Sequence, residues 1–152
     1  MSKITQPHSM NWDLTSYFPK FDGPEMVQFK KSLKKEIEEI LTIAVILDPL
    51  KEDNQAEWEK IFIRSENILT RLSHLKSYVG CLASTDACNE AYLREEARIV
   101  QISAEFSKLV VQLQRAIKET TKEIFKSFTT RKTFANARFF LERTRKEARH
   151  TM

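Results

Sequence analysis

Turn-forming residues are scarce in this sequence, which has two glycines and four prolines among its 152 residues. A sheet protein of this length would need many more of them, so the composition excludes a strand-rich fold and favours an all-α one. Cysteine is equally scarce. Cys81 and Cys88 are too few for a disulfide framework, and we expect two reduced thiols. A single bridge stays open as the alternative, because both residues flank a predicted turn.

Long apolar runs are also missing. The longest, Ile43–Leu47, is far shorter than the roughly 20 residues that span a bilayer. Residues 1–11 are polar and lack the apolar segment of a signal peptide, so we expect a cytoplasmic protein. Hydrophobic residues make up 41% of the chain and charged residues 30%, as in ordinary globular domains. We expect residues 1–11 to be a loose tail and residues 12–152 to be a single helical domain.

The net charge of +4 is small and unevenly placed. Between Lys126 and Arg149 there are eight Lys or Arg residues against two Glu, which gives 8 − 2 = +6. Such a segment can bind nucleic acid or an acidic partner. No aromatic stacking platform accompanies the charges, so we favour a solvated helix face and regard nucleic acid as an unlikely partner. The basic side chains concerned are Arg138, Arg143, Arg145, Lys146 and Arg149.

Two long segments carry apolar residues at three- and four-residue steps, the spacing of an amphipathic helix. The first covers residues 54–84, and its apolar positions are Trp58, Ile61, Phe62, Ser65, Ile68, Leu69, Leu72, Leu75, Val79 and Leu82. The second runs from residue 89 to 125–128, and its apolar positions are Tyr92, Ile99, Phe106, Val110, Leu113, Ile117 and Ile124. A short polar turn joins them, which predicts an antiparallel helical hairpin. At about 1.5 Å per residue, the second helix would be on the order of 54 Å long.

Two further helices are expected to complete an antiparallel bundle, over residues 25–47 and 133–150. The end of the first at Ile43–Leu47 is apolar on every side, so we expect it to be the most buried part of that helix. Lys30 lies among the charged residues that line its other side. Trp12–Pro19, rich in aromatic residues, predicts an extended N-terminal strap across the helices.

Two asparagines mark predicted helix starts. Asn54 precedes Glu57 by three residues, which is the spacing of a capping box. Asn89 precedes Glu90, an acid favoured in the first turn, and is predicted to cap the second long helix.

The sequence contains few candidate catalytic or metal-binding residues. The three histidines, His8, His74 and His150, form no HExxH pattern. His74 could be grouped with Cys81 and Cys88 as zinc ligands, but a fourth ligand is missing, and we favour a partly buried histidine. Two isolated glycines allow no phosphate-binding loop, and no GxSxG motif is present. We therefore predict no catalytic, cofactor-binding or metal-binding residue in this chain.

Three stretches resemble the N-terminal region of the oligoendopeptidase F family of zinc metallopeptidases. Trp12–Pro19, reading Trp-Asp-Leu-Thr-Ser-Tyr-Phe-Pro, is similar to the opening of that family. Tyr78–Asp86 resembles its helix-ending segment, in which an aromatic and small residues precede a Thr-Asp turn. Phe139–His150 resembles the link to the rest of the enzyme. The likeness spans residues 12–150.

The resemblance implies that this chain is a non-catalytic helical wall over the peptide-binding channel of a longer enzyme that hydrolyses short peptides. Its partners would be the catalytic domain of the same polypeptide and, through it, short peptides. Zinc would be bound by an HExxH helix that this sequence does not contain, so no zinc ligand is assigned here. Arg149–Met152 has no Gly or Pro helix stop, which favours a segment of a longer protein.

The alternative is a free-standing helical adaptor that binds a partner helix. Its binding surface would be a second apolar stripe formed by Ile102 and Leu109, beside Ile99 and Phe106.

Overall fold

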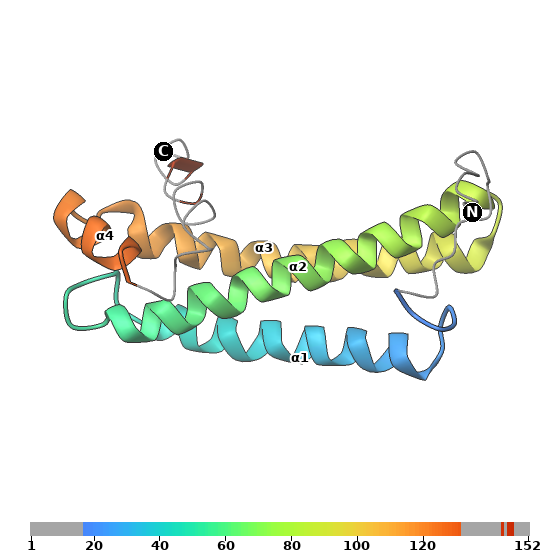
Figure 1. Cartoon of the computed structure of the whole chain (residues 1–152), viewed down its shortest axis with the longest axis horizontal. Helices are drawn as coiled ribbons and strands as arrows, with labels where there is room; N and C mark the ends of the chain where they lie inside the picture. Colours follow the sequence, from blue (N-terminus) through green and yellow to red (C-terminus); the bar gives the residue numbers. More distant parts are fainter. Residues whose placement is uncertain (1–16, 132–143, 145, 148–152) are drawn as a thin grey trace, which may run out of the picture.

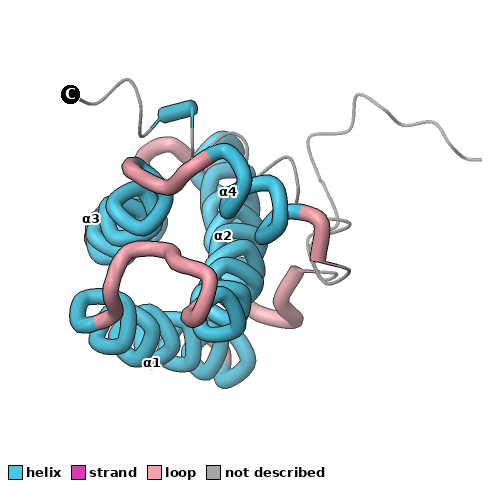
Figure 2. The backbone as a smooth tube through the Cα atoms, turned by 90° about the vertical axis from the view of Figure 1, so that its left-hand side faces the viewer, coloured by secondary structure: helices cyan, strands magenta, loops and turns pink. Residues whose placement is uncertain are grey.

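The computed structural model describes residues 17–131, 144 and 146–147, and within this part of the chain four α-helices and no strands are found. They are α1 (Pro24–Ile46), α2 (Gln55–Thr85), α3 (Glu90–Lys118) and α4 (Lys122–Thr129). The predicted all-α class is confirmed. Helices α1, α2 and α3 lie side by side and successive helices run in opposite directions (Figure 1). Viewed end-on, the three occupy the corners of a triangle (Figure 2).

The core lies inside this triangle, and all three helices contribute to it. Trp58, Leu72, Phe106 and Leu113, from the predicted stripes of α2 and α3, are buried. α1 packs against both of these helices. Its core residues are Met26, Leu33, Ile37, Ile40 and Ala44. The apolar stripes therefore fold into one three-helix core, in which α1 is an equal member.

The C-terminal end of α1 was predicted to be its most buried part, and this is wrong. Ala44 is buried, but Ile43, Val45 and Ile46 are exposed, and Ile46 is 81% exposed. The reason is geometric. α1 has neighbours on one side only, so apolar residues that point away from α2 and α3 meet no other described helix.

Asn54 stands before the first residue of α2, but its side chain makes no capping hydrogen bond, so the predicted capping box is wrong. Instead it holds the loop between α1 and α2. Its Oδ1 accepts from the Lys51 backbone N–H at 2.7 Å. Its Nδ2 donates to the carbonyl oxygens of Asp48 and Pro49 at 3.1 and 3.0 Å. The Asn54 side chain therefore binds backbone groups of the loop and not the first N–H groups of α2.

The predicted cap at Asn89 is confirmed. Its Oδ1 accepts hydrogen bonds from the backbone N–H groups of Ala91 and Tyr92, at 2.9 and 3.3 Å. These bonds satisfy two N–H groups that have no partner within the helix.

The predicted extension of the second long helix to residues 125–128 is wrong. α3 ends at Lys118, and Thr121 caps a separate helix, α4, with its Oγ1 accepting from the Ile124 N–H at 3.2 Å. Thr120 and Thr121 are β-branched residues with hydroxyls that compete for backbone groups, and both properties disfavour a helix interior. α4 packs on α2 through a ring contact between Phe128 and Phe62, with centroids 5.7 Å apart.

Several predictions fall outside the described residues. These are the loose tail, the part of the aromatic segment before Tyr17, and most of the helix expected over 133–150. Thr144, Lys146 and Glu147 of that last segment are helical.

Candidate functional site

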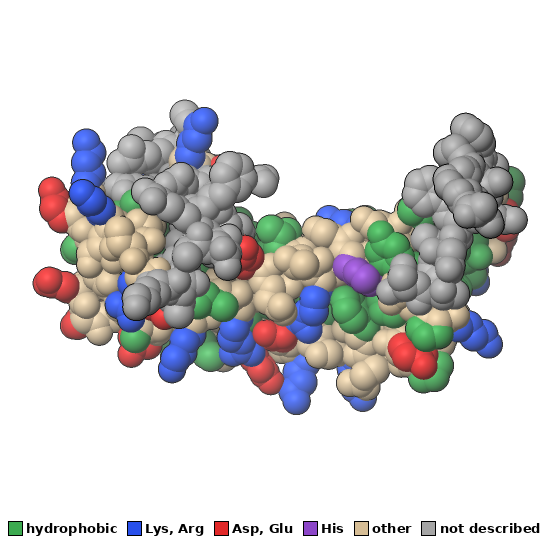
Figure 3. Space-filling view, in the orientation of Figure 1, with side chains coloured by type: hydrophobic (Ala, Val, Ile, Leu, Met, Phe, Trp, Pro, Cys, Tyr) green, Lys and Arg blue, Asp and Glu red, His purple; other side chains and the backbone are tan. Residues whose placement is uncertain are grey.

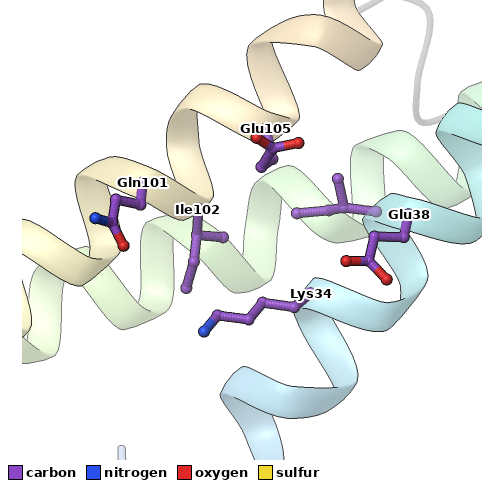
Figure 4. Close-up of a pocket in the computed structure, with 6 residues that line it drawn as sticks. Lys34, Glu38, Gln101, Ile102 and Glu105 are labelled. Atoms are coloured by element: carbon purple, nitrogen blue, oxygen red, sulfur yellow. The ribbon is translucent and has the colours of Figure 1, made fainter.

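A cleft of about 370 Å³ separates α1 from α3 along one side of the bundle. Ile37 and Ile102, both buried, lie at its base. Four polar side chains surround them. Lys34 and Glu38 come from α1, whereas Gln101 and Glu105 come from α3 (Figure 4). An apolar base with mixed charges around it suits an aliphatic chain with a polar end. It does not arrange a nucleophile against a base, so we assign no reaction to it.

A buried charge pair crosses the same interface. Lys30 Nζ lies 2.7 Å from Glu95 Oε2, and Arg98 Nη1 lies 3.2 Å from Glu95 Oε1. The Glu95 side chain is 1% exposed and that of Lys30 is 13% exposed. The prediction that Lys30 lies on the charged outer side of its helix is therefore wrong. The sequence itself indicated that Glu95 is buried, because Glu95 stands four residues before Ile99, in register with the apolar positions of α3.

A second charged cluster joins α1 to α2. Glu36 pairs with both Arg64 and Arg71, and Arg64 also pairs with Glu39 at 3.3 Å. Arg71 is only 22% exposed. Both clusters link α1 to a neighbouring helix, so they indicate structural roles. On the face shown in Figure 3, acidic and basic side chains are mixed along the edge formed by α1.

His74 lies within an aromatic cluster that includes Tyr17 and Phe18, the first described residues of the chain. Its ring centroid is 4.5 Å from that of Tyr17, 5.5 Å from Phe18 and 5.7 Å from Phe29. Phe18 is itself buried and packs against Tyr78 at 5.0 Å. Burial raises the pKa of the Tyr78 phenol, and the nearby phenol of Tyr92 raises it further. The histidine is half-buried among rings, as predicted.

Metal binding finds no support in the described residues. They contain no group of three or more His, Cys, Asp or Glu side chains placed to hold a metal ion. Cys81 and Cys88 are free thiols, so the alternative of a bridge between them is wrong. Cys81 is half-buried and Cys88 is exposed.

The adaptor surface expected on α3 is not available, because Ile99, Ile102, Phe106 and Leu109 are all buried. α3 packs against α1 and α2 together, so both predicted stripes belong to the core.

One exposed apolar surface of the described residues lies in a groove of about 340 Å³ between α1 and α2. Its apolar residues are Ile40, Ile43, Ile61 and Ile63. Ile43 and Ile63 are exposed, and Val45 and Ile46 are exposed on α1 in the neighbouring sequence. We call Ile43, Ile46 and Ile63 the α1-end patch. Lys60 and Arg64 also line the groove.

No protein-family model, curated protein or solved structure matches the chain. None of the helices in the described part of the chain combines the length and apolar character needed to cross a bilayer. Most of the basic C-terminal segment, Lys126–Arg149, lies outside the described residues.

Proposed function

We propose that this chain is the non-catalytic helical N-terminal domain of an oligoendopeptidase-F-like zinc metallopeptidase. In that role it walls the peptide-binding channel of a longer enzyme that hydrolyses short peptides. Zinc and the groups that activate water belong to the remainder of that enzyme. The three stretches named above support the family, and the helical bundle is compatible with a rigid wall.

The α1-end patch carries the proposal. Ile43 and Ile63 are exposed in an apolar groove, and Ile46 is exposed three residues after Ile43 on the same side of α1. Burying one aliphatic side chain completely contributes about 1.5–3 kcal/mol, so leaving several in water forgoes a large stabilisation. Clustered exposed apolar residues mark interaction surfaces. A domain that packs against the body of its own enzyme would cover this surface permanently.

Rigidity is the second requirement of a wall. Glu95 and Glu36 each link α1 to a neighbouring helix through ion pairs. Arg115 on α3 donates from Nη2 to the carbonyl oxygens of Ala44 and Leu47, at 2.9 and 3.0 Å. The end of α1 that carries the patch is therefore fixed to α3, and the patch is presented on a rigid support.

The first test is to read the gene beyond the codon for Met152. The frame should continue and encode HExxH, and the protein made from the whole frame should contain zinc and cleave short fluorogenic peptides. A frame that ends at Met152, or that continues without HExxH, overturns the proposal.

The second test asks whether the α1-end patch is an internal contact. Ile46→Asp should change the stability of the 152-residue chain by no more than about 0.5 kcal/mol, as for exposed sites generally. In the longer protein, the same change should destabilise by about 1.5–3 kcal/mol, because it places a charge in an apolar contact. Val27→Asp, at an exposed apolar residue near the other end of α1, is the control. Equal effects of Ile46→Asp in both proteins would contradict the packing role.

A further inference from the structure

The polar side chains of the cleft between α1 and α3 are sorted by charge along its length. Each helix contributes two of them, one turn apart. In Figure 4 the ammonium of Lys34 and the amide of Gln101 lie toward one end of the cleft. The carboxylates of Glu38 and Glu105 lie toward the other. One end can therefore bind an anionic group, and the other a cationic group.

The register of the two helices produces this arrangement. α1 and α3 run in the same direction, because each is antiparallel to α2 (Figure 1). Lys30 pairs with Glu95 on one side of the cleft, and Arg115 donates to the Ala44 carbonyl oxygen on the other. These two contacts hold the helices in register, so the carboxylates of both helices come to the same end of the cleft.

The acidic end is not neutralised by the cations near it. Among the described residues, neither Lys34 nor Glu38 has an ion-pair partner, and Figure 4 shows the Lys34 ammonium directed away from Glu38. Glu105 pairs with Lys108 at 2.9 Å, but both side chains are at least half exposed, and such a pair contributes little. Two carboxylates therefore face one exposed ammonium, which leaves this end negative.

The opposite end is positive. Besides Lys34, it has Lys30 and Arg98 in the preceding turn of each helix, and these two cations share a single carboxylate, that of Glu95. Gln101 adds an amide that can donate a hydrogen bond to a carboxylate. Three cations against one carboxylate favour an anionic group here.

The base between the two ends is apolar, because Ile37 and Ile102 are both buried there. Four residues of helix separate the ends, which is about 6 Å at 1.5 Å per residue. With C–C bonds of about 1.5 Å, a chain of about four or five methylene groups spans that distance. The cleft volume of about 370 Å³ lies within the range of about 300–1,000 Å³ of small-molecule sites.

We infer that this cleft binds a molecule whose ammonium and carboxylate groups are joined by a straight chain of about five methylene groups. Its ammonium lies between Glu38 and Glu105, and its carboxylate lies beside Lys34 and Gln101. A free ω-amino acid and the C-terminal lysine of a peptide both have this chemistry. The cleft and the α1-end patch lie against different neighbours of α1, and the inference does not rest on the proposed function.

ε-Aminocaproate is the probe. Titrated into the 152-residue chain, it should shift the backbone amide NMR signals of Ile37 and Ile102 and give a dissociation constant. Hexanoate lacks the ammonium and hexylamine lacks the carboxylate, so each should bind at least about tenfold more weakly.

Substitutions at the two ends separate the two recognised groups. Lys34→Met should weaken ε-aminocaproate binding about tenfold and remove its advantage over hexylamine, because the carboxylate has lost its partner. Glu38→Gln/Glu105→Gln should weaken it about tenfold and remove its advantage over hexanoate. Lys35→Met, at an exposed lysine that does not line the cleft, is the matched control and should leave binding within about twofold. Urea denaturation checks that each variant keeps its fold.

Three results overturn the inference. The first is no binding of ε-aminocaproate at about 10 mM. The second is binding of hexanoate or of hexylamine as tight as that of ε-aminocaproate, which would indicate a ligand with one charged group. The third is an equal effect of Lys34→Met and Lys35→Met.

The two sources are distinguished with a short peptide that ends in lysine, tested with its C-terminal carboxylate free and as the amide. A free-carboxylate peptide that binds more tightly than ε-aminocaproate, and whose amide binds at least about tenfold more weakly, assigns the site to a lysine C-terminus. A peptide that binds more weakly than ε-aminocaproate assigns it to a free ω-amino acid. Either result supports recognition of the paired charges.

Discussion

Lys30 Nζ and Glu95 Oε2, 2.7 Å apart, join α1 to α3 through a carboxylate that is almost completely buried. Withdrawing such a group from water is costly, and the nearby ammonium offsets that cost only while both partners stay in place. The pair therefore favours one alignment of α1 along α3, because sliding either helix would leave the carboxylate with only Arg98 of its own helix beside it.

Lys30→Met should lower the free energy of unfolding by about 3 kcal/mol, because it leaves the Glu95 carboxylate buried with only Arg98 beside it. Urea denaturation measures this loss. The double variant Lys30→Met/Glu95→Leu should recover most of it, since no buried charge remains. Lys108→Met, at the exposed pair with Glu105, is the control and should cost about 0–1 kcal/mol. Equal losses for Lys30→Met and Lys108→Met would contradict the role of burial.

Arg115→Met should destabilise the chain by about 1.5–3 kcal/mol, because the guanidinium donates to the carbonyl oxygens of Ala44 and Leu47 at the end of α1. Hydrogen exchange should show faster opening of the last turn of α1 in this variant than of its first turns. Arg94→Met removes an exposed cation from the same helix and serves as the control. Uniformly faster exchange along α1 would argue against a local clamp.

Gly80→Ala should stabilise the chain by about 0.5–1 kcal/mol, because glycine within a helix loses more conformational freedom than alanine. Gly80 lies within α2, and an added Cβ would meet no heavy atom within 4 Å. Thermal denaturation measures the gain. Gly23→Ala is the matched comparison, since its Cβ would lie 3.2 Å from Lys20 atoms at the start of α1. It should show no gain, and an equal gain at both glycines would be contrary to expectation.

Stability should fall at high pH through Tyr78. Burial raises the pKa of its phenol above the ordinary value of 10.0, with a smaller contribution from Tyr92. The folded protein therefore keeps this proton to higher pH than the unfolded chain does. The associated stability is complete below the unfolded value and is lost as the pH rises through the folded value. Denaturation at a series of alkaline pH values should show a shallower decline for Tyr78→Phe, and identical declines would refute the assignment.

Periodicity predicted the elements of this fold well, because the apolar stripes of α2 and α3 are long and regular. It could not predict which faces would find neighbours. Ile43–Leu47 was predicted to be the most buried part of its helix, yet Ala44 is the one residue of these five that is buried. That outcome depends on the number of helices beside α1, which composition does not specify.

Polar residues were harder to interpret than apolar ones. Asn89 acts through neighbouring backbone groups and was predicted correctly. Asn54 and Glu95 act through partners whose positions depend on the folded loop and on a second helix.

The turn between α2 and α3 lies at the end of the bundle opposite α4 (Figure 1), and it exposes the Cys88 thiol while Cys81 is half-buried. A maleimide dye should therefore modify Cys88 first. The native sequence thus offers a reporter at one tip of the molecule, from which rotational diffusion of the whole rod and its lengthening in any complex can be followed without introducing a new thiol.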